Sequence, residues 1–355
     1  MFLDHFVADF APVRLRFGHG VRHQIGEELA SLDASRVFIM ATVQQRALAG
    51  QIAQLSGARV AGLFTDAVMH TPVEVSEQAT AQARAADADL LIAVGGGSAI
   101  GLSKAIALRT GLPQLVLPTT YAGSEATSIL GQTEAGRKTT LVDRRVQPRA
   151  IVYDPELTLS LPVDMSAASA MNAMAHAVEA LYARDRNPLS TLMAQEGLRA
   201  FAESVPTIVR LPDDAPARAR ALYGAWLCGT VLGQVGMALH HKLCHTLGGS
   251  FGLPHAQTHA IVLPHVVAYN AVAVPDLLAP VAEIFQGATP GAALHSFAQR
   301  IGAPLALREL GLAEADLDRV VELALDQPYW NPRPLQADTL RRMLQAAWAG
   351  QAPVD

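Results

Sequence analysis

The chain contains few cysteines and only a small excess of negative over positive charge. The 355 residues include two cysteines, Cys228 and Cys244, which are too few for a disulfide framework or a zinc-finger pattern. The formal net charge is −5, and no long basic run occurs. This composition argues against nucleic acid or an anionic membrane surface as the main partner. An anionic substrate would have to meet positive side chains that are grouped locally.

Long apolar runs are missing as well. No stretch reaches about 18 residues without a polar interruption, which is the length that a membrane-spanning helix needs. The nearest candidate, residues 221–239, contains Gln234 and many small residues, a composition that favours a buried helix. The first residues also lack the basic region followed by an apolar region that is typical of a secretory leader. We therefore expect a cytoplasmic protein with no membrane partner.

The first part of the chain alternates between two kinds of segment. Short β-type runs at 36–41, 58–64, 89–94 and 114–118 are separated by helical runs at 44–55, 73–86 and 98–110. This alternation predicts a parallel sheet that helices cover on both faces, as in a Rossmann-like domain. The chain is long enough for a second domain with its own core.

The pattern changes near residue 160, where the β signal fades. Alanine- and leucine-rich helical runs follow, and the longest of them include 216–247 and 255–274. We therefore assign residues 1–160 to an α/β dinucleotide-binding domain and residues 161–355 to an all-α domain. We expect the active site between the two, because pockets tend to form at domain boundaries.

A glycine-rich turn joins the third predicted strand to its helix. Residues 90–94 lead directly into Gly95-Gly96-Gly97-Ser98, and a helix opens at once. Glycines let the backbone approach a pyrophosphate closely, and the helix N-terminus offers N–H donors and a positive dipole. The pattern differs from the Gly-x-Gly-x-x-Gly fingerprint, because Gly101 comes one residue late. We expect the turn to bind phosphate groups of a cofactor.

Histidines gather in the second half of the chain. His241 and His245 are four residues apart, so a helix places both side chains on one face. We expect the Gly248-Gly249 pair to end this helix and Pro254 to start the next one, which brings His255 back toward His241. Imidazoles gathered in this way bind metals or move protons, because their unperturbed pKa lies near neutrality. The same stretch also contains His240 and His259.

A second motif precedes the histidines. It reads Asn172-Ala-Met-Ala-His176-Ala-Val-Glu179-Ala-Leu-Tyr182, and Asn172 and His176 would again share a helix face. This motif, the stretch 240–249 and the Tyr-Trp-Asn-Pro-Arg-Pro stretch at 329–334 resemble the maleylacetate reductase branch of the iron-containing alcohol dehydrogenase superfamily. The resemblance spans nearly the whole chain. It implies the dehydroquinate synthase-like fold of that superfamily, with a Rossmann-like domain followed by an all-α domain.

The resemblance also implies an activity. Maleylacetate reductases transfer a hydride from NADH or NADPH to the C=C bond of maleylacetate and form 3-oxoadipate in the degradation of aromatic compounds. Hydride addition beside a ketone leaves an enolate, which needs a hydrogen-bond donor and a proton. We expect His241 and His245 at the reacting end, with His176 and His255 shaping the site. The family further implies a homodimer.

The implied substrate is a small dicarboxylate, which needs cationic and polar partners. Arg333 is our candidate for pairing with a carboxylate, because its planar fork binds carboxylates in a bidentate way. Tyr329 and Asn331 stand beside it in the sequence. Lys242 adjoins the histidines, although a helix turns it about 100° away from its neighbour. Asn172 completes the predicted substrate-binding set.

Further cofactor contacts follow from the resemblance. Thr119, Thr120 and Thr127 come after a predicted strand, where hydroxyl groups can hold ribose and nicotinamide, and Lys138 lies in a segment that carries a cofactor-facing lysine in the family. The first predicted strand leads into Met-Ala-Thr at 40–42 rather than an aspartate. A carboxylate there would bind a ribose 2′-hydroxyl and repel a 2′-phosphate. Both NADH and NADPH are therefore compatible with the sequence.

Asn172 is the main departure from the superfamily pattern, in which an aspartate and three histidines bind a metal ion. An asparagine offers a neutral oxygen, whereas an aspartate would offset the charge of the cation. We therefore expect no metal requirement. The alternative is a metal-dependent alcohol dehydrogenase of the same superfamily, in which Asn172, His176, His241 and His255 would bind Fe²⁺ or Zn²⁺.

Two further alternatives lack part of their pattern. A non-catalytic nucleotide-binding or metal-sensing protein would keep the glycine turn but would have no converging proton donors. A lyase resembling dehydroquinate synthase, with NAD and zinc, would need a glutamate in place of Asn172.

Overall fold

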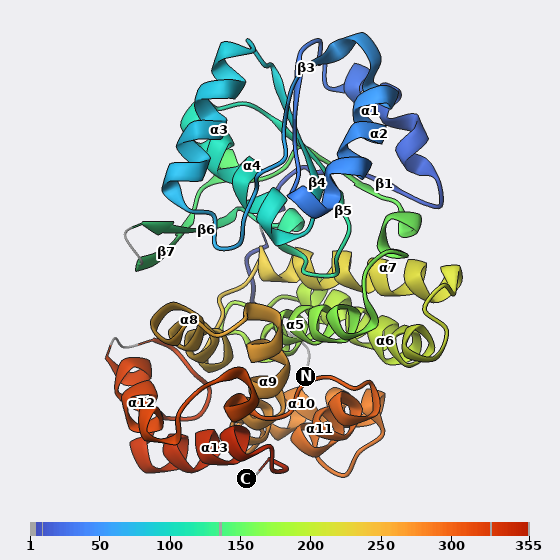
Figure 1. Ribbon diagram of the computed structural model, residues 1–355. Coiled ribbons are helices and arrows are strands. Elements are labelled where there is room, and N and C mark those ends of the chain that lie inside the picture. The colour runs from blue at the N-terminus through green and yellow to red at the C-terminus, as the bar shows by residue number, and fades with distance from the viewer. Residues whose placement is uncertain (1–4, 9, 135–136, 327–328, 354–355) are drawn as a thin grey trace. The chain divides into compact units, whose positions relative to one another are not determined.

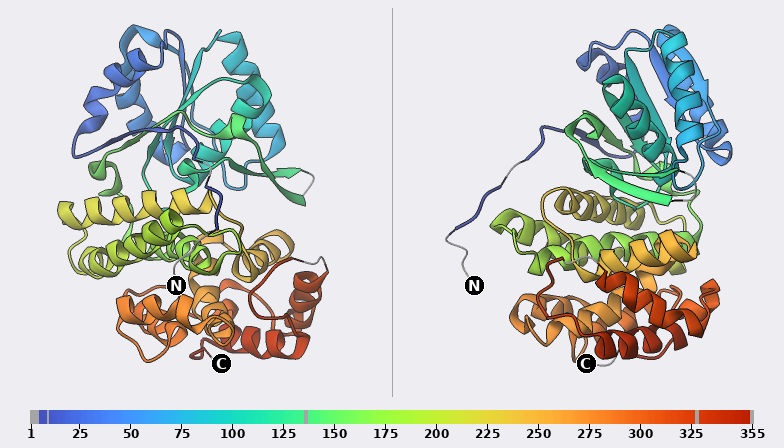
Figure 2. Two further views of the ribbon diagram at one scale, coloured as in Figure 1. Left: turned by 180° about the vertical axis from the view of Figure 1, so that it is seen from behind. Right: turned by 90° about the vertical axis from the view of Figure 1, so that its left-hand side faces the viewer.

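The chain folds into two compact units, which Figures 1 and 2 draw as ribbons. The computed structural model describes residues 5–8, 10–134, 137–326 and 329–353. One unit spans Phe10–Leu161, and the other comprises Pro162–Asp355 with the described residues that precede Phe10. The division falls one residue after the boundary expected at 160, because Pro162 directly precedes the first turn of a long helix. The start of the chain groups with the helical unit instead of the α/β unit.

A six-stranded parallel sheet forms the centre of the α/β unit as far as the chain is described. The strand order is β1 (Arg14–Phe17), β8 (Ala150–Tyr153), β5 (Gln114–Pro118), β4 (Leu90–Gly95), β2 (Val37–Met40) and β3 (Val60–Phe64). The four strands expected from the sequence are β2, β3, β4 and β5, and the expected parallel sheet is confirmed. The sequence reading missed β1 and β8, which extend the sheet on one side.

Helices cover both faces of this sheet (Figure 1). On one face Ile92 of β4 packs in a core with α1 (Ile25–Ser31) and α2 (Arg46–Ser56). On the other face its neighbour Leu91 packs with α3 (Val73–Ala85) and α4 (Gly97–Thr110). Burial on both faces explains why β2 and β4 are continuous apolar runs rather than alternating ones.

A separate antiparallel hairpin completes the α/β unit. Its strands are β6 (Ile129–Glu134) and β7 (Arg137–Val142). Seven of its twelve residues are polar, so no apolar run predicts it. The hairpin contacts α3 and α4, and a short 3-10 turn, η4 (Ser124–Ala126), leads into it.

The second unit is built from helices. They are α5 (Val163–Tyr182), α6 (Pro188–Arg210), α7 (Ala215–Leu232), α8 (Leu239–Phe251), α9 (His255–Ala271), α10 (Pro275–Phe285), α11 (Pro290–Arg300), α12 (Leu317–Leu325) and α13 (Ala337–Ala349). Helix α5 is buried from Ser166 to its end because α6, α7, α9 and α10 all pack against it. None of the described helices is long and apolar enough to cross a membrane.

The expected helix over 216–247 is wrong in one respect. The chain leaves the helix at Leu232, and α8 begins only at Leu239. Between them, Asp185 accepts a hydrogen bond from the backbone N–H of Gly236, and Glu179 accepts one from that of Ala238. These carboxylates satisfy N–H groups that a continuous helix would have used internally.

The expected end of the histidine-bearing helix is also corrected. Helix α8 runs through Gly248 and Gly249 and ends at Gly252, whose φ of 69° is the left-handed conformation that glycine favours at helix ends. The next helix does begin at His255 directly after Pro254, as expected. Residues 307–310 form only a 3-10 turn.

Candidate active site

The glycine turn lies at the carboxyl end of β4. Gly95 ends the strand with a φ of 141°, and Gly96 precedes the first residue of α4. A Cβ atom on Gly96 would lie 2.7 Å from Cγ2 of Thr120, so only glycine fits there. A Cβ atom on Gly97 would meet no other described atom within 4 Å. The backbone at the N-terminus of α4 is therefore open to a ligand, which suits a phosphate group.

The position of this turn in the sheet also suits a dinucleotide. The chain passes from β2 outward to the edge strand β3 and then returns to β4 on the other side of β2. Ligands of open α/β sheets bind outside the carboxyl ends of strands at such a reversal. The residues present therefore fit the phosphates of a dinucleotide. After β2, Ala41 and Thr42 offer no carboxylate to a ribose.

The predicted threonines lie on the loop that follows β5. The backbone N–H of Thr119 donates to Gly95 O at 3.2 Å, which ties this loop to the glycine turn. Thr120 packs against Gly96, as described above. The hydroxyl of Thr127 donates to Ser124 O, so it helps to shape the loop. Lys138 lies on β7, but its side chain is outside the described part of the structure, and its cofactor role stays a prediction.

Lys104 organises the same loop, and sequence reasoning missed it. Its Nζ donates to the carbonyl oxygens of Ser124 at 2.6 Å, Thr127 at 2.7 Å and Ile129 at 2.9 Å. Burial lowers the pKa of this ammonium group to about 7, although Glu125 opposes the shift. The signal in the sequence was a lone lysine in the apolar helix after the glycine turn.

Gly101, in the first turns of α4, closely approaches the segment that precedes α3. A Cβ atom on this residue would lie 2.3 Å from Oγ1 of Thr71. Any side chain at this position would therefore displace the loop that precedes α3.

The helical unit brings six histidine rings together. They come from α5 (His176), α8 (His240, His241 and His245) and α9 (His255 and His259). The ring of His241 is central, with centroids 5.2 Å from His176, 5.1 Å from His259 and 6.2 Å from His245. The ring of His255 packs against that of His259 at 4.3 Å. The turn between α8 and α9 thus returns the chain toward the first histidines.

Glu179 holds His241 in place, and the sequence reading assigned it no role. Its Oε2 lies 2.7 Å from Nδ1 of His241. The carboxylate also accepts the backbone N–H groups of Ala238 at 3.0 Å and His240 at 2.9 Å, so it caps the N-terminus of α8 from α5. Burial raises the pKa of Glu179, but the hydrogen bond with His241 and the nearby donors outweigh it and lower the pKa to about 2.

This anionic partner determines which nitrogen of His241 is available. The carboxylate accepts hydrogen bonds only, so Nδ1 of His241 carries the proton between them. The other ring nitrogen, Nε2, is buried and has no hydrogen-bond partner among the described residues. Nε2 is therefore the atom of His241 that is available to a ligand.

Two further polar atoms, both on α5, are also buried without a hydrogen-bond partner in the described part of the chain. They are Oδ1 of Asn172 and Nδ1 of His176, which lie one helical turn apart. Burial, and then the neighbouring histidines, lower the pKa of His176 well below its ordinary value, so its imidazole is neutral. Buried polar groups are normally paired, and these atoms therefore indicate a ligand site.

The same residues fit a resident iron poorly. Asn172 contributes a neutral oxygen, and the carboxylate of Glu179, which contacts His241, already binds this histidine and two backbone N–H groups. A metal ion needs at least three ligand atoms close together. Among the described histidine, cysteine and acidic side chains, a group of three with ligand atoms within 4.8 Å of one another is formed by His240, Cys244 and His259. The predicted set of His176, His241 and His255 does not gather in this way.

The C-terminal segment joins the same network. Asn331 exchanges amide hydrogen bonds with Asn270 at 2.7 and 3.1 Å. Asn270 also donates to the hydroxyl of Tyr182, which donates to Glu179 at 3.2 Å. Asn331 therefore supports the Glu179–His241 pair from a distance, and its direct contact with substrate stays a prediction.

The remaining predicted substrate residues lie beside this network. The guanidinium of Arg333 donates to Tyr269 O at 2.9 Å and lies over the Tyr269 ring at 4.3 Å. Nζ of Lys242 lies 5.7 Å from the ring of Tyr329. The Tyr329 hydroxyl is buried without a partner among the described residues, and burial, followed by Glu179, raises its pKa.

Two family models match the chain. The one described as iron-containing alcohol dehydrogenase matches residues 12–155, and the C-terminal model of the Fe-containing alcohol dehydrogenase family matches residues 166–348. A maleylacetate reductase from Rhizobium sp. (strain MTP-10005) is 55% identical over 351 residues, which cover 99% of this chain and 100% of the relative. One from Pseudomonas sp. (strain P51) is 50% identical, covering 98% and 99%.

The fold agrees with these matches. The crystal structure of maleylacetate reductase from Agrobacterium tumefaciens is 54% identical, covers 99% of this chain and 100% of its own, and has a TM-score of 0.96. The predicted fold and the resemblance read from the motifs are both confirmed. The chain belongs to the iron-containing alcohol dehydrogenase family and, within it, to the group of the maleylacetate reductases.

Proposed function

We propose that this protein reduces the C=C bond of maleylacetate to give 3-oxoadipate and oxidises NADH or NADPH in the process. Full-length relatives named maleylacetate reductase support the reaction. The observation that carries the mechanism is the hydrogen bond of 2.7 Å between Glu179 and His241. It leaves a buried imidazole nitrogen without a partner in the described protein, next to other unpaired polar atoms.

The reaction needs a hydride, a stabilised enolate and a proton. When bound, the nicotinamide cofactor would supply the hydride, whose electron pair forms the new C–H bond while the π pair of the C=C bond moves toward the ketone. The charge then moves onto the ketone oxygen as an enolate, and a positioned hydrogen-bond donor stabilises it. His241, once its ring also carries a proton on Nε2, is the group best placed to give that proton to the adjacent carbon, and the anionic Glu179 holds the Nδ1 proton during the transfer. His245 is the second candidate, because it lies one helical turn farther along α8.

The substrate is a dianion, and the helical unit offers it donors of the right kind. Tyr329 contributes a buried hydroxyl that has no partner among the described residues, and Asn172 can donate from its amide nitrogen. Lys242 and Arg333 supply positive charge, and Arg333 keeps further N–H groups beyond the one that binds Tyr269. We infer that these side chains bind the two carboxylates and the ketone.

The cofactor is a nicotinamide dinucleotide, and we propose that its phosphates bind the open backbone at Gly97. The loop that carries Thr119 and Thr120 is tied to the glycine turn and is placed to contact the ribose. The absence of a carboxylate at 41–42 supports the use of NADPH as well as NADH.

We further propose that no metal ion takes part in turnover. The donor chemistry of Asn172 and the commitment of Glu179 to His241 support this proposal. In a metal-free site, the neutral His176 and the amide of Asn172 serve as hydrogen-bonding groups for the substrate instead of ligands.

The reaction itself is tested by following NADH and NADPH oxidation with freshly prepared maleylacetate and by identifying 3-oxoadipate as the product. Oxidation of primary alcohols by NAD⁺ serves as the comparison. Stoichiometric formation of 3-oxoadipate supports the proposal. Alcohol oxidation without any reduction of maleylacetate would replace it with an alcohol dehydrogenase activity.

A further inference from the structure

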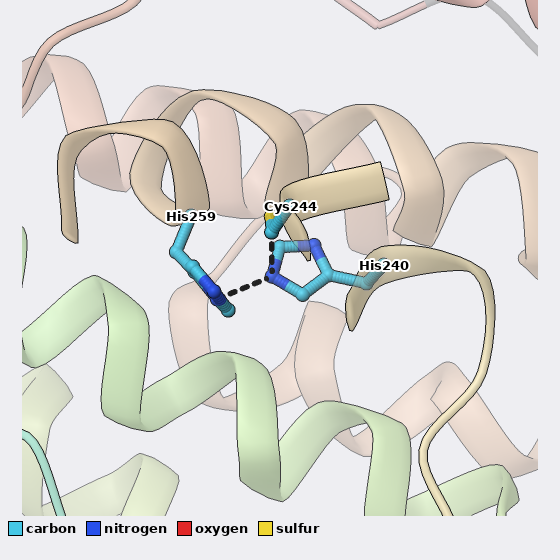
Figure 3. Close-up of side chains that lie close together, drawn as sticks. All are labelled: His240, Cys244 and His259. Carbon is cyan, nitrogen blue, oxygen red and sulfur yellow. Dashed lines mark hydrogen bonds between the residues drawn. The ribbon is translucent and has the colours of Figure 1, made fainter. Parts of the chain in front are cut away.

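A second group of side chains lies next to His241, the histidine to which we assign proton transfer. Figure 3 shows His240 and Cys244 of α8 with His259 of α9, all pointing toward one another. Nε2 of His240 lies 2.9 Å from Nδ1 of His259, and Sγ of Cys244 lies 3.6 Å from the same nitrogen of His240. All three side chains are buried, and their ligand atoms lie within 4.8 Å of one another.

We propose that His240, Cys244 and His259 form a binding site for Zn²⁺ that is separate from the substrate site. Zinc binds imidazole nitrogen at about 2.0–2.1 Å and thiolate sulfur at about 2.3 Å. Tetrahedral geometry then separates two nitrogens by about 3.4 Å and a nitrogen from a sulfur by about 3.6 Å. The nitrogen–sulfur distance already agrees, and the two nitrogens need to part by only a few tenths of an ångström.

The donor set suits zinc better than the set at Asn172. It contains a thiol, which becomes an anionic ligand on binding, and two imidazoles. The outer nitrogens, Nδ1 of His240 and Nε2 of His259, have no partner in the described protein, so each can take the ring proton while the inner nitrogens bind the ion. Binding then releases one proton, from the Cys244 thiol to the buffer, for each zinc ion.

A zinc ion here would inhibit the proposed reductase, an inference that rests on the proposed function. The ring of His259 packs 5.1 Å from that of His241, and the backbone N–H of His240 binds Glu179. Zinc would replace the hydrogen bond between His240 and His259 and turn both rings. The groups that surround the Glu179–His241 pair would then shift, and turnover would fall.

The direct test of the site uses metal binding rather than activity. Full-length protein is treated with EDTA, freed of chelator and titrated with Co²⁺, whose complexes with thiolates have a charge-transfer band in the near ultraviolet. We expect one ion per chain, a thiolate band in the wild type, and displacement of cobalt by Zn²⁺ with release of one proton. This test uses the wild type alone, so it does not depend on whether a variant folds. Binding without a thiolate band, or no binding, would overturn the proposal.

Two cysteine variants provide a matched comparison. Cys244→Ser should abolish the thiolate band and weaken zinc binding by about a hundredfold or more, whereas Cys228→Ser should change neither, because Cys228 is buried on α7 away from the three ligands. Zn²⁺ should inhibit the wild type and Cys228→Ser but not Cys244→Ser. Equal inhibition of the three proteins would show that Zn²⁺ does not inhibit through this site. If no protein reduces maleylacetate, the proposed function fails, and the cobalt spectrum still decides the site.

Discussion

Glu179 on α5 and His241 on α8 are 62 residues apart in the sequence, and a hydrogen bond of 2.7 Å joins Oε2 of the first to Nδ1 of the second. The carboxylate keeps the proton on Nδ1 and leaves Nε2 without a hydrogen-bond partner among the described residues. Pairing with a carboxylate also stabilises the ring when it is protonated. The chemistry that we assign to His241 therefore depends on a residue that need not touch the substrate.

Removing this charge should slow the reaction far more than it weakens cofactor binding. We expect Glu179→Gln to lower kcat by about 10- to 100-fold, the range found for groups that orient catalytic ligands. The cofactor Kd should stay within about twofold, because the glycine turn is in the other unit. Steady-state kinetics and fluorescence titration measure the two quantities.

A double-mutant cycle separates this role from the helix-capping role of Glu179. If Glu179 acts through His241, the double variant Glu179→Gln/His241→Gln should be no slower than His241→Gln alone. Independent, multiplying losses of kcat in the double variant would contradict the pairing. Circular dichroism identifies any variant whose α8 has unfolded.

His245 gives a second prediction about proton transfer. Its ring is exposed on α8, 6.2 Å from His241. His245→Ala should lower kcat by about 10²- to 10⁴-fold if it is the general acid, with little change in cofactor Kd. Comparison with His241→Gln identifies the proton donor as the residue whose loss lowers kcat more. Unchanged turnover in His245→Ala would remove His245 from the mechanism.

Gly97 tests the cofactor site. A Cβ atom at this residue enters space that is open in the described protein, so Gly97→Ala should fold normally. If the pyrophosphate occupies that space, the variant should bind NADH at least about tenfold more weakly, a change of about 1.4 kcal/mol. Gly50→Ala on α2, where a Cβ also meets nothing described within 4 Å, is the control and should keep the wild-type Kd. Equal affinities for NADH in the wild type and both variants would show that the phosphates bind elsewhere.

Lys104 predicts how stability depends on pH. Burial lowers its pKa from 10.5 to about 7, so between these values the unfolded chain holds a proton that the folded protein has released. Stability should therefore rise with pH across this window, and the destabilisation should be fully present below it. Each pKa unit corresponds to about 1.4 kcal/mol.

The matching variant is Lys104→Met, which keeps the length of the side chain and cannot titrate. Urea unfolding of both proteins between about pH 6 and pH 10 should show that the wild type gains a few kcal/mol relative to the variant as pH rises. A difference that does not change with pH would mean that the oxygens of Ser124, Thr127 and Ile129 keep the ammonium group charged throughout.

The sequence was sufficient for four neighbouring strands, β5, β4, β2 and β3, but not for β8 and β1 on the other side of β5. The run Leu-Leu-Ile-Ala-Val-Gly of β4 is apolar throughout because both of its faces are covered. The edge strand β1 reads Arg-Leu-Arg-Phe and is only partly buried, so it carries no comparable signal. The hairpin strand β7 is as polar as a loop. Burial made β4 easy to predict, but β8 was missed although its four residues are all buried, because its apolar run is short.

The candidate site, too, could be predicted from the sequence only in part. Spacing along one helix was enough to group Asn172 with His176 and His241 with His245, because residues four apart share a face. The partner of His241 lay beyond such local patterns, since Glu179 approaches from another helix. The break between α7 and α8 was missed for the same reason, because the carboxylates that satisfy its N–H groups come from other segments of the chain.

Metal-free reduction of maleylacetate, as proposed above, can be tested on the purified protein. The most direct measurement is the rate of NADH and NADPH oxidation with maleylacetate by EDTA-treated protein, with and without added Fe²⁺. We predict full turnover in the chelated sample and no stimulation by Fe²⁺. Loss of turnover in EDTA and its recovery with Fe²⁺ would contradict the account and would show that Asn172, His176, His241 and His255 form a working metal site.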